Sequence, residues 1–186
     1  IYWREAGDTG YPPTLDWSGS TNIDGVEFLW PAPHRIRQEL QPENFAESYV
    51  YSDTVTFPII ITTKDSAKPS NISLHISYAI CSDICIPAEA NLNLHILPQD
   101  ISPENLEIIE SAKKLIPQKN GTYGLNIEAI NKVVIAGEKE EFLEVTATNQ
   151  NTDFSENTSI FIEGGNNFAF NNPSSSITGK TAKFNI

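Results

Sequence analysis

The chain has 186 residues, and its 24 acidic side chains outnumber the 12 basic ones, giving a formal net charge of −12. Because nucleic-acid binding depends largely on cationic contacts to phosphate, we expect no nucleic-acid partner. No segment approaches the roughly 18 to 20 consecutive apolar residues of a membrane-spanning helix. The length suits two small domains. The chain begins without an initiator methionine or a signal region, which favours a processed or excised fragment.

The first part of the chain predicts little regular structure. Residues 1–24 combine glycines and prolines with large aromatic side chains, which is typical of an ordered coil packed on a sheet. Residues 26–30 predict a strand that ends at Pro31. Residues 34–49 are polar and irregular, so we expect a long loop there that is either functional or mobile.

Three later segments show the period-2 alternation of half-buried strands, at residues 54–62, 72–80 and 92–96. The link between the last two contains Cys81 and Cys85. We therefore expect a hairpin-like pair of strands with the cysteines in its connection. The alternation places Cys81 on the polar face of its strand, in an accessible position.

Residues 102–117 predict a helix, because Ser102 can cap its N-terminus and apolar residues recur at helical spacing up to Pro117. Short strands are then expected around residues 125–135, 142–148, 160–163 and 168–170. The pattern favours a mainly β fold with two immunoglobulin-like β-sandwich domains joined by a short helix. We expect the cysteine-bearing domain, the linker helix and the second domain at residues 1–100, 101–119 and 120–186.

Three chemistries are open to the cysteine pair. Two cysteines alone on an exposed turn favour an oxidising compartment. Three intervening residues allow Cys81 and Cys85 to form a disulfide and to exchange electrons with a partner. Asp83 between them would disfavour a thiolate. A structural staple is the second interpretation, although closing so small a loop stabilises little. The spacing of the two cysteines alone favours the redox and staple interpretations equally.

The third interpretation is a Cu(I) site, since two sulfurs suit a soft metal. However, the chain has no methionine, and His75 and His95 lie six and ten residues from the nearer cysteine. At strand spacing this separation is roughly 20 Å or more, too far for a shared coordination shell. His34 is the one histidine whose distance from the cysteines the sequence leaves open. We therefore expect neither a metal nor a cofactor, with Cu(I) at Cys81 and Cys85 as the alternative.

Several segments match a known family in order over about residues 1 to 98. They are Pro13-Thr14-Leu15-Asp16-Trp17, Phe28-Leu29-Trp30-Pro31-Ala32-Pro33, Thr54-Val55-Thr56-Phe57-Pro58 and Tyr78-Ala79-Ile80-Cys81 through Cys85-Ile86-Pro87-Ala88-Glu89. Together they resemble the N-terminal periplasmic domain of the DsbD family of thiol:disulfide interchange proteins, especially the ScsB branch of suppressors of copper sensitivity. DsbD itself places five residues between its cysteines, whereas this chain and the ScsB branch place three. Residues 120–186 resemble the second β domain that this branch appends.

The resemblance implies a periplasmic immunoglobulin-like domain that works as a thiol-disulfide oxidoreductase, or protein-disulfide reductase, without a cofactor. It would take two electrons from a transmembrane DsbD/ScsB-type reductase domain. It would pass them to a thioredoxin-like or disulfide-isomerase-like periplasmic protein, with copper tolerance as the associated physiology. Cys85 would be the attacking cysteine and Cys81 its partner. The family shields its disulfide with a phenylalanine on a cap loop, and Phe45 matches that residue by position.

Overall fold

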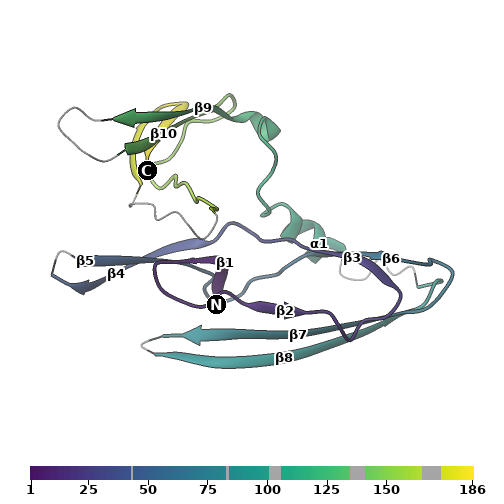
Figure 1. Ribbon diagram of the computed structural model, residues 1–186. Coiled ribbons are helices and arrows are strands. Elements are labelled where there is room, and N and C mark those ends of the chain that lie inside the picture. Colours follow the sequence, from purple (N-terminus) through teal and green to yellow (C-terminus); the bar gives the residue numbers. More distant parts are fainter. Residues whose placement is uncertain (43, 83, 101–105, 135–140, 165–172) are drawn as a thin grey trace. The chain divides into compact units, whose positions relative to one another are not determined.

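The chain folds into two compact units, Ile1–Pro117 and Gln118–Ile186 (Figure 1). The computed structural model describes all residues except 43, 83, 101–105, 135–140 and 165–172. Each unit has strands and a buried apolar cluster of its own. Among the described helices, none has the length and apolar character needed to cross a bilayer.

In the described part of the first unit, eight strands form three antiparallel sheets. One sheet has the order β1 (Tyr2–Gly7), β5 (Asn44–Val50) and β4 (His34–Gln41). Another has the order β2 (Thr14–Asp16), β7 (Ser70–Cys81) and β8 (Cys85–Ile96). The third pairs β3 (Ile23–Phe28) with β6 (Ile59–Thr63).

The hairpin of β7 and β8 is the longest pairing in this unit, and it confirms the predicted pair of strands. Its register runs without a bulge from Ser70 opposite Ile96 to Cys81 opposite Cys85. Ile72 and Leu74 are buried and anchor the far end of the hairpin in the core. The cysteines lie at the opposite end, where the hairpin turns.

An aromatic cluster fills the space beside the third sheet. The ring of Phe57 lies 5.0 Å from that of Phe28, 5.3 Å from that of Trp30 and 5.2 Å from that of Tyr51, between centroids. The Tyr51 hydroxyl donates a 2.7 Å hydrogen bond to the carbonyl oxygen of Pro31. These large rings bury much apolar area, and the hydrogen bond satisfies the hydroxyl of Tyr51.

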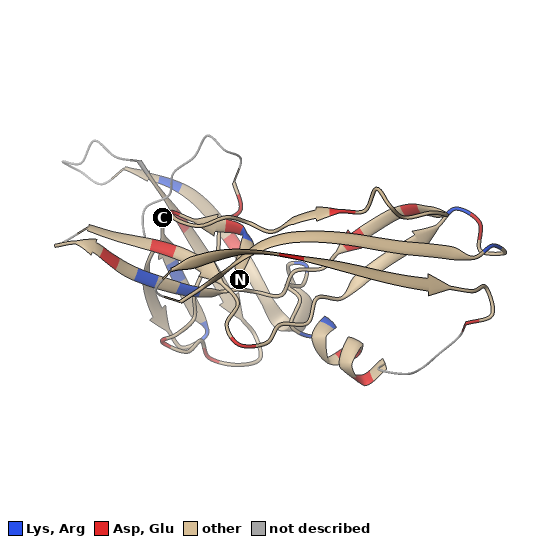
Figure 2. Ribbon diagram, turned by 90° about the horizontal axis from the view of Figure 1, so that it is seen from below, with Lys and Arg blue, Asp and Glu red and all other residues tan. Residues whose placement is uncertain are grey.

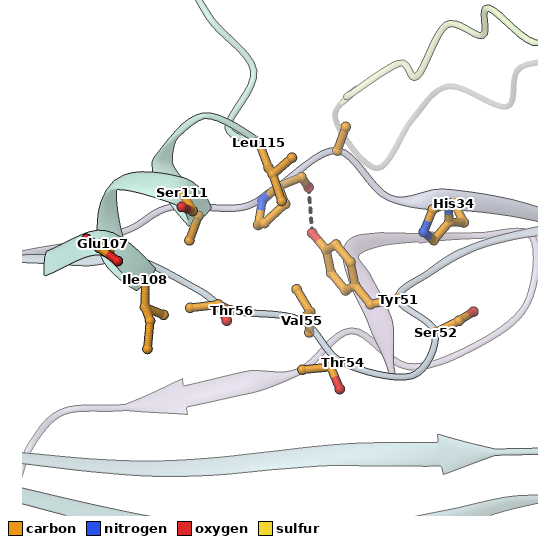
Figure 3. A pocket seen from close by; sticks show the side chains of 13 residues that line it. His34, Tyr51, Ser52, Thr54, Val55, Thr56, Glu107, Ile108, Ser111 and Leu115 are labelled. Carbon is orange, nitrogen blue, oxygen red and sulfur yellow. Dashed lines mark hydrogen bonds between the residues drawn. The ribbon is translucent and has the colours of Figure 1, made fainter. Parts of the chain in front are cut away.

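Helix α1 (Leu106–Lys113) belongs to the first unit. Its Ala112 is 4% exposed, and just beyond the helix the carbonyl oxygen of Leu115 accepts a hydrogen bond from the backbone N–H of Ala32. An open cavity of about 650 Å³ lies between the helix and the segments that contain His34 and Tyr51 (Figure 3). The helix therefore packs on the first unit. The expected capping residue Ser102 lies outside the described residues.

The second unit contains a four-stranded antiparallel sheet in the order β11 (Ser174–Thr178), β12 (Thr181–Asn185), β10 (Glu141–Asn149) and β9 (Leu125–Val134). A 3₁₀ turn, Thr122–Gly124, precedes β9. One face of the sheet forms the core, where Ala182 and Phe184 are buried. Partly buried hydrophobic side chains pack against them: Phe154, Ile160, Ile162 and Ile177.

The mainly β fold of immunoglobulin-like sandwich type with a short helix is confirmed. Some local predictions were wrong. Residues 1–24 contain β1 and β2 as well as coil, and residues 54–58 precede β6 without forming a strand. Residues 160–163 form no strand either; Ile160 and Ile162 instead pack on the second core from an irregular segment. The strand expected at 168–170 lies outside the described residues.

The long loop expected at residues 34–49 is instead the hairpin of β4 and β5. Nearly all of β4 is exposed to solvent, so its sequence lacks the apolar alternation that marks a half-buried strand. Backbone hydrogen bonds to β5 hold it, and β5 in turn pairs with β1. A strand without a buried face cannot be recognised from hydrophobic periodicity.

Candidate functional site

Cys81 and Cys85 form a disulfide at the end of the β7–β8 hairpin. Cys81 is the last residue of β7 and Cys85 the first of β8, so the two face each other across the ladder with their Cα atoms 4.1 Å apart. Both cysteines are exposed. The accessible position expected for Cys81 is what the structure shows. Asp83, which stands between them in the sequence and is expected to disfavour a thiolate, lies outside the described residues.

The face of β7 that carries Cys81 is covered at this end of the strand. Ala79, two residues before Cys81 and therefore on the same face, is buried in a cluster with Tyr2 and Ala6 of β1. The sequence assigns this face to solvent, because Ser73, His75 and Ser77 precede Ala79 on it. The first strand thus brings an apolar patch directly beneath the disulfide.

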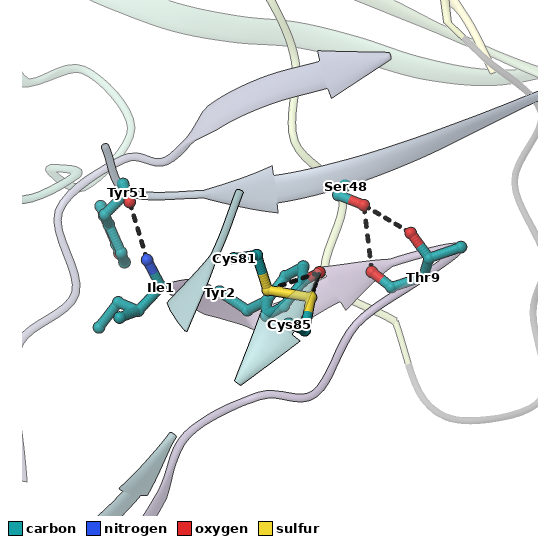
Figure 4. Close-up of a disulfide and its surroundings, with 7 residues drawn as sticks. All are labelled: Ile1, Tyr2, Thr9, Ser48, Tyr51, Cys81 and Cys85. Atoms are coloured by element: carbon teal, nitrogen blue, oxygen red, sulfur yellow. Dashed lines mark hydrogen bonds between the residues drawn. A yellow bond between two sulfur atoms is a disulfide. The ribbon is translucent and has the colours of Figure 1, made fainter. Parts of the chain in front are cut away.

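Tyr2 is the side chain whose hydroxyl reaches the disulfide. Its oxygen lies 3.3 Å from Sγ of Cys85 and 3.4 Å from Sγ of Cys81, as the dashed lines in Figure 4 show. Since disulfide sulfurs carry no proton, the hydroxyl is the donor in this state. Tyr2 as a residue is 8% exposed, so a buried residue presents a hydroxyl to an exposed pair of sulfurs.

The backbone around Tyr2 fixes this arrangement. Gly10 has a φ of +121°, and a Cβ at this position would overlap the ring of Tyr2. Only glycine combines this backbone conformation with so close an approach. Beside Tyr2, the N–H of Tyr51 donates a 2.7 Å hydrogen bond to the carbonyl oxygen of Ile1, which ties β1 to the end of β5. The hydroxyl is therefore held in place by both backbone and packing.

Sequence reasoning missed Tyr2. It stands 79 residues before Cys81 and 83 before Cys85, and no spacing rule connects such positions. The aromatic character of the first residues was the available signal, since it indicates packing on a sheet. It does not indicate which ring reaches the cysteines.

Phe45, the expected cap residue, lies in β5 near the end of the β4–β5 hairpin. Its side chain is 39% exposed, and the guanidinium carbon of Arg37 stands 4.0 Å from the centroid of its ring. Figure 1 shows the ends of this hairpin and of the β7–β8 hairpin at the same end of the first unit. The contacts described for Phe45 are with Arg37, whereas those described for the two sulfurs are with Tyr2.

The three histidines have other neighbours. Nδ1 of His75 is 2.9 Å from the side-chain oxygen of Asn91, and Nδ1 of His95 is 2.6 Å from that of Asn71. His34 lines the cavity beside α1 (Figure 3). Within the described part of the chain, no group of three or more His, Cys, Asp or Glu side chains could hold a metal ion. A Cu(I) site on the cysteines would require the reduced pair.

Several exposed apolar side chains lie beside the disulfide. Ile80, Ile84 and Ile86 are all exposed, Ile84 by 72%. Charged residues are spread over the chain in Figure 2, yet Glu89 is the single Lys, Arg, Asp or Glu in β7 and β8. Exposed apolar side chains next to a functional group are typical of a surface that contacts another protein.

Together these features define a β-sandwich domain with an exposed two-cysteine disulfide at a hairpin end. Residues 1–96 match the family model for the N-terminal domain of the thiol:disulfide interchange protein DsbD. The chain belongs to this family, and its first unit is a thiol:disulfide interchange domain.

One solved structure extends the comparison to both units. The crystal structure of the N-terminal periplasmic domain of ScsB from Proteus mirabilis aligns with a TM-score of 0.71 at 20% sequence identity. The alignment covers 99% of this chain and 66% of that one, so this chain spans about two thirds of its length. At this identity the match shows a common fold. Among curated proteins, no sequence matches this chain significantly.

Proposed function

We propose that the chain is a periplasmic electron relay in which Cys81 and Cys85 cycle between dithiol and disulfide. The electron donor is a transmembrane reductase domain of the DsbD/ScsB type. The acceptor is an oxidised periplasmic protein with a thioredoxin-like or disulfide-isomerase-like fold. The activity is that of a protein-disulfide reductase, which requires two thiols and no cofactor.

The exchange runs through mixed disulfides. In the reduced domain, the thiolate of Cys85 attacks one sulfur of the acceptor disulfide, and the other acceptor sulfur leaves as a thiolate. Cys81 then attacks Sγ of Cys85, which releases the acceptor with both of its cysteines reduced. Two electrons have passed to the acceptor, and Cys81–Cys85 is again the disulfide. The donor domain restores the dithiol by the same steps in reverse.

The observation that carries this proposal is the exposure of the disulfide at the free end of a continuous hairpin. A staple would add little at this position, because the ladder already pairs β7 and β8 along their full length and the closed loop is short. Accessible sulfurs beside exposed isoleucines instead suit attack by, or on, a second protein.

Trapping of the mixed disulfide tests the proposal. In a Cys81→Ser variant, Cys85 can attack a partner but cannot be released by its own neighbour. We expect this variant to accumulate a disulfide-linked complex with an oxidised thioredoxin-like protein, seen on non-reducing gels and reversed by dithiothreitol. The matched control is Cys81→Ser combined with Cys85→Ser, which should form none. If Cys81→Ser forms no more complex than this control, the relay is refuted and the staple is favoured.

A further inference from the structure

The position of the Tyr2 hydroxyl has a consequence for the chemistry of the pair. It lies almost equally far from the two sulfurs, at 3.3 and 3.4 Å, so it can serve whichever of them carries charge. Its ring is fixed between the backbone of Gly10 and the buried cluster that includes Ala79. The donor is therefore in place before any reaction begins.

We propose that Tyr2 is a catalytic residue of the cysteine pair, whose hydroxyl donates a hydrogen bond to the sulfur that becomes a thiolate. The inference rests on the proposed function for its biological meaning, because thiolates arise only when the pair is reduced or in a mixed disulfide. Its subject is narrower, namely the acidity of Cys81 and Cys85.

The chemical argument depends on the difference between the two redox states. A disulfide sulfur is a neutral and weak hydrogen-bond acceptor, whereas a thiolate is charged and accepts a much stronger bond. The hydroxyl therefore stabilises the reduced pair more than the oxidised one, and it lowers the pKa of the thiol that it contacts. Both cysteines lie on strands, where no helix N-terminus is available to do this.

The same argument explains why tyrosine serves better than phenylalanine at this position. Packing against Ala6 and Ala79 needs the ring, which both residues provide. The hydroxyl adds a polar group whose described partners are the two sulfurs. Tyr2→Phe consequently removes the donor while keeping the ring in the cluster.

The test measures thiol acidity with a small reagent, iodoacetamide, so that no protein partner is needed. Tyr2→Phe is placed in two single-cysteine backgrounds, Cys81→Ser and Cys85→Ser, and the alkylation rate is followed against pH. We expect the midpoint of the profile to move upward by about one pH unit in at least one background. Below the midpoint the rate should fall about threefold, since greater thiolate nucleophilicity offsets part of an about tenfold fall in thiolate fraction.

Tyr78→Phe is the matched control, because it removes a hydroxyl from β7 on the face opposite to Cys81. It should leave the profile unchanged, and thermal unfolding should show that all variants are folded. An unchanged midpoint for Tyr2→Phe in both backgrounds, or an equal shift with Tyr78→Phe, overturns the inference. Failure of the proposed relay would be seen separately, as the absence of a trapped complex with Tyr2 intact.

Discussion

At the scale of single residues, the disulfide has one described polar contact and one candidate shield. Tyr2 supplies the contact from beneath. We propose Phe45 as the candidate shield, because it matches by position the cap residue that the resemblance to the DsbD family implies, and its hairpin ends on the same side of the first unit as the disulfide (Figure 1). In the oxidised structure its partly exposed ring lies against Arg37. The contact described for this ring is the one with Arg37, and the ring is partly exposed, so its removal should leave the core intact.

Replacement of Phe45 by alanine tests the shielding role. If the ring restricts access to the sulfurs, Phe45→Ala should let dithiothreitol reduce Cys81–Cys85 several-fold faster, while the equilibrium reduction potential stays the same. Stopped-flow measurement of the reduction rate checks this. Ile36→Ala, which removes another exposed side chain from the same hairpin, is the control. Equal rates for Phe45→Ala and the unchanged protein would remove Phe45 from the site.

At the scale of elements, the β4–β5 hairpin is held at its base by a partly buried ion pair. Nε of Arg35 lies 3.2 Å from a carboxylate oxygen of Glu47, whose side chain is 8% exposed. Arg35 is opposite Tyr49 in the register, so Glu47 is its diagonal neighbour on the same face. Burial raises the pKa of Tyr49 above its usual range. The backbone N–H of Glu47 donates a 2.8 Å hydrogen bond to the Asp8 carboxylate.

Replacement of Arg35 should therefore destabilise the β4–β5 hairpin where it joins the rest of the first unit. We expect Arg35→Met to lower the free energy of unfolding by about 2 to 3 kcal/mol, because it removes a charge partner from a buried carboxylate. Urea denaturation measures the change. The double variant Arg35→Met with Glu47→Gln should cost less than the sum of the two single variants, since the two side chains interact directly. Strict additivity would show that the ion pair contributes nothing.

At the scale of the whole molecule, the two units have separate buried clusters, and helix α1 belongs to the first. Ala112 is buried, and the hydrogen bond from Ala32 to Leu115 fastens the end of the helix to the segment after β3. The fragment that should fold alone is therefore residues 1–117, which ends after the helix.

Truncation distinguishes the two boundaries. We expect residues 1–117 to unfold in one cooperative transition and to keep the alkylation profile of the full chain. The fragment of residues 1–100 lacks α1, and the loss of the helix uncovers the apolar surface around Tyr51. Its free energy of unfolding, measured in urea, should therefore be lower by about 1 to 2 kcal/mol. Equal stability of the two fragments would make the helix a linker without a structural contribution.

Sequence alone determined the β7–β8 hairpin and the place of the cysteines at its end. The reason is that a strand with one buried face has alternating apolar and polar residues, and the apolar ones are the buried ones, as Ile72 and Leu74 show. It also determined the mainly β class and, through the quoted segments, the family that the match over residues 1–96 shows. The roles of Cys85 and Phe45 stay predictions.

Only the tertiary structure decided what lies against the disulfide. Alternation indicates which face of a strand is buried, but the identity of the covering residue depends on which distant strand packs there. Tyr2 reaches the sulfurs across about 80 residues of sequence, and the exposed strand β4 owes its existence to backbone pairing. Hydrophobic periodicity indicates which face of a single element is buried. It cannot predict contacts between residues far apart in the sequence, or strands that have no buried face.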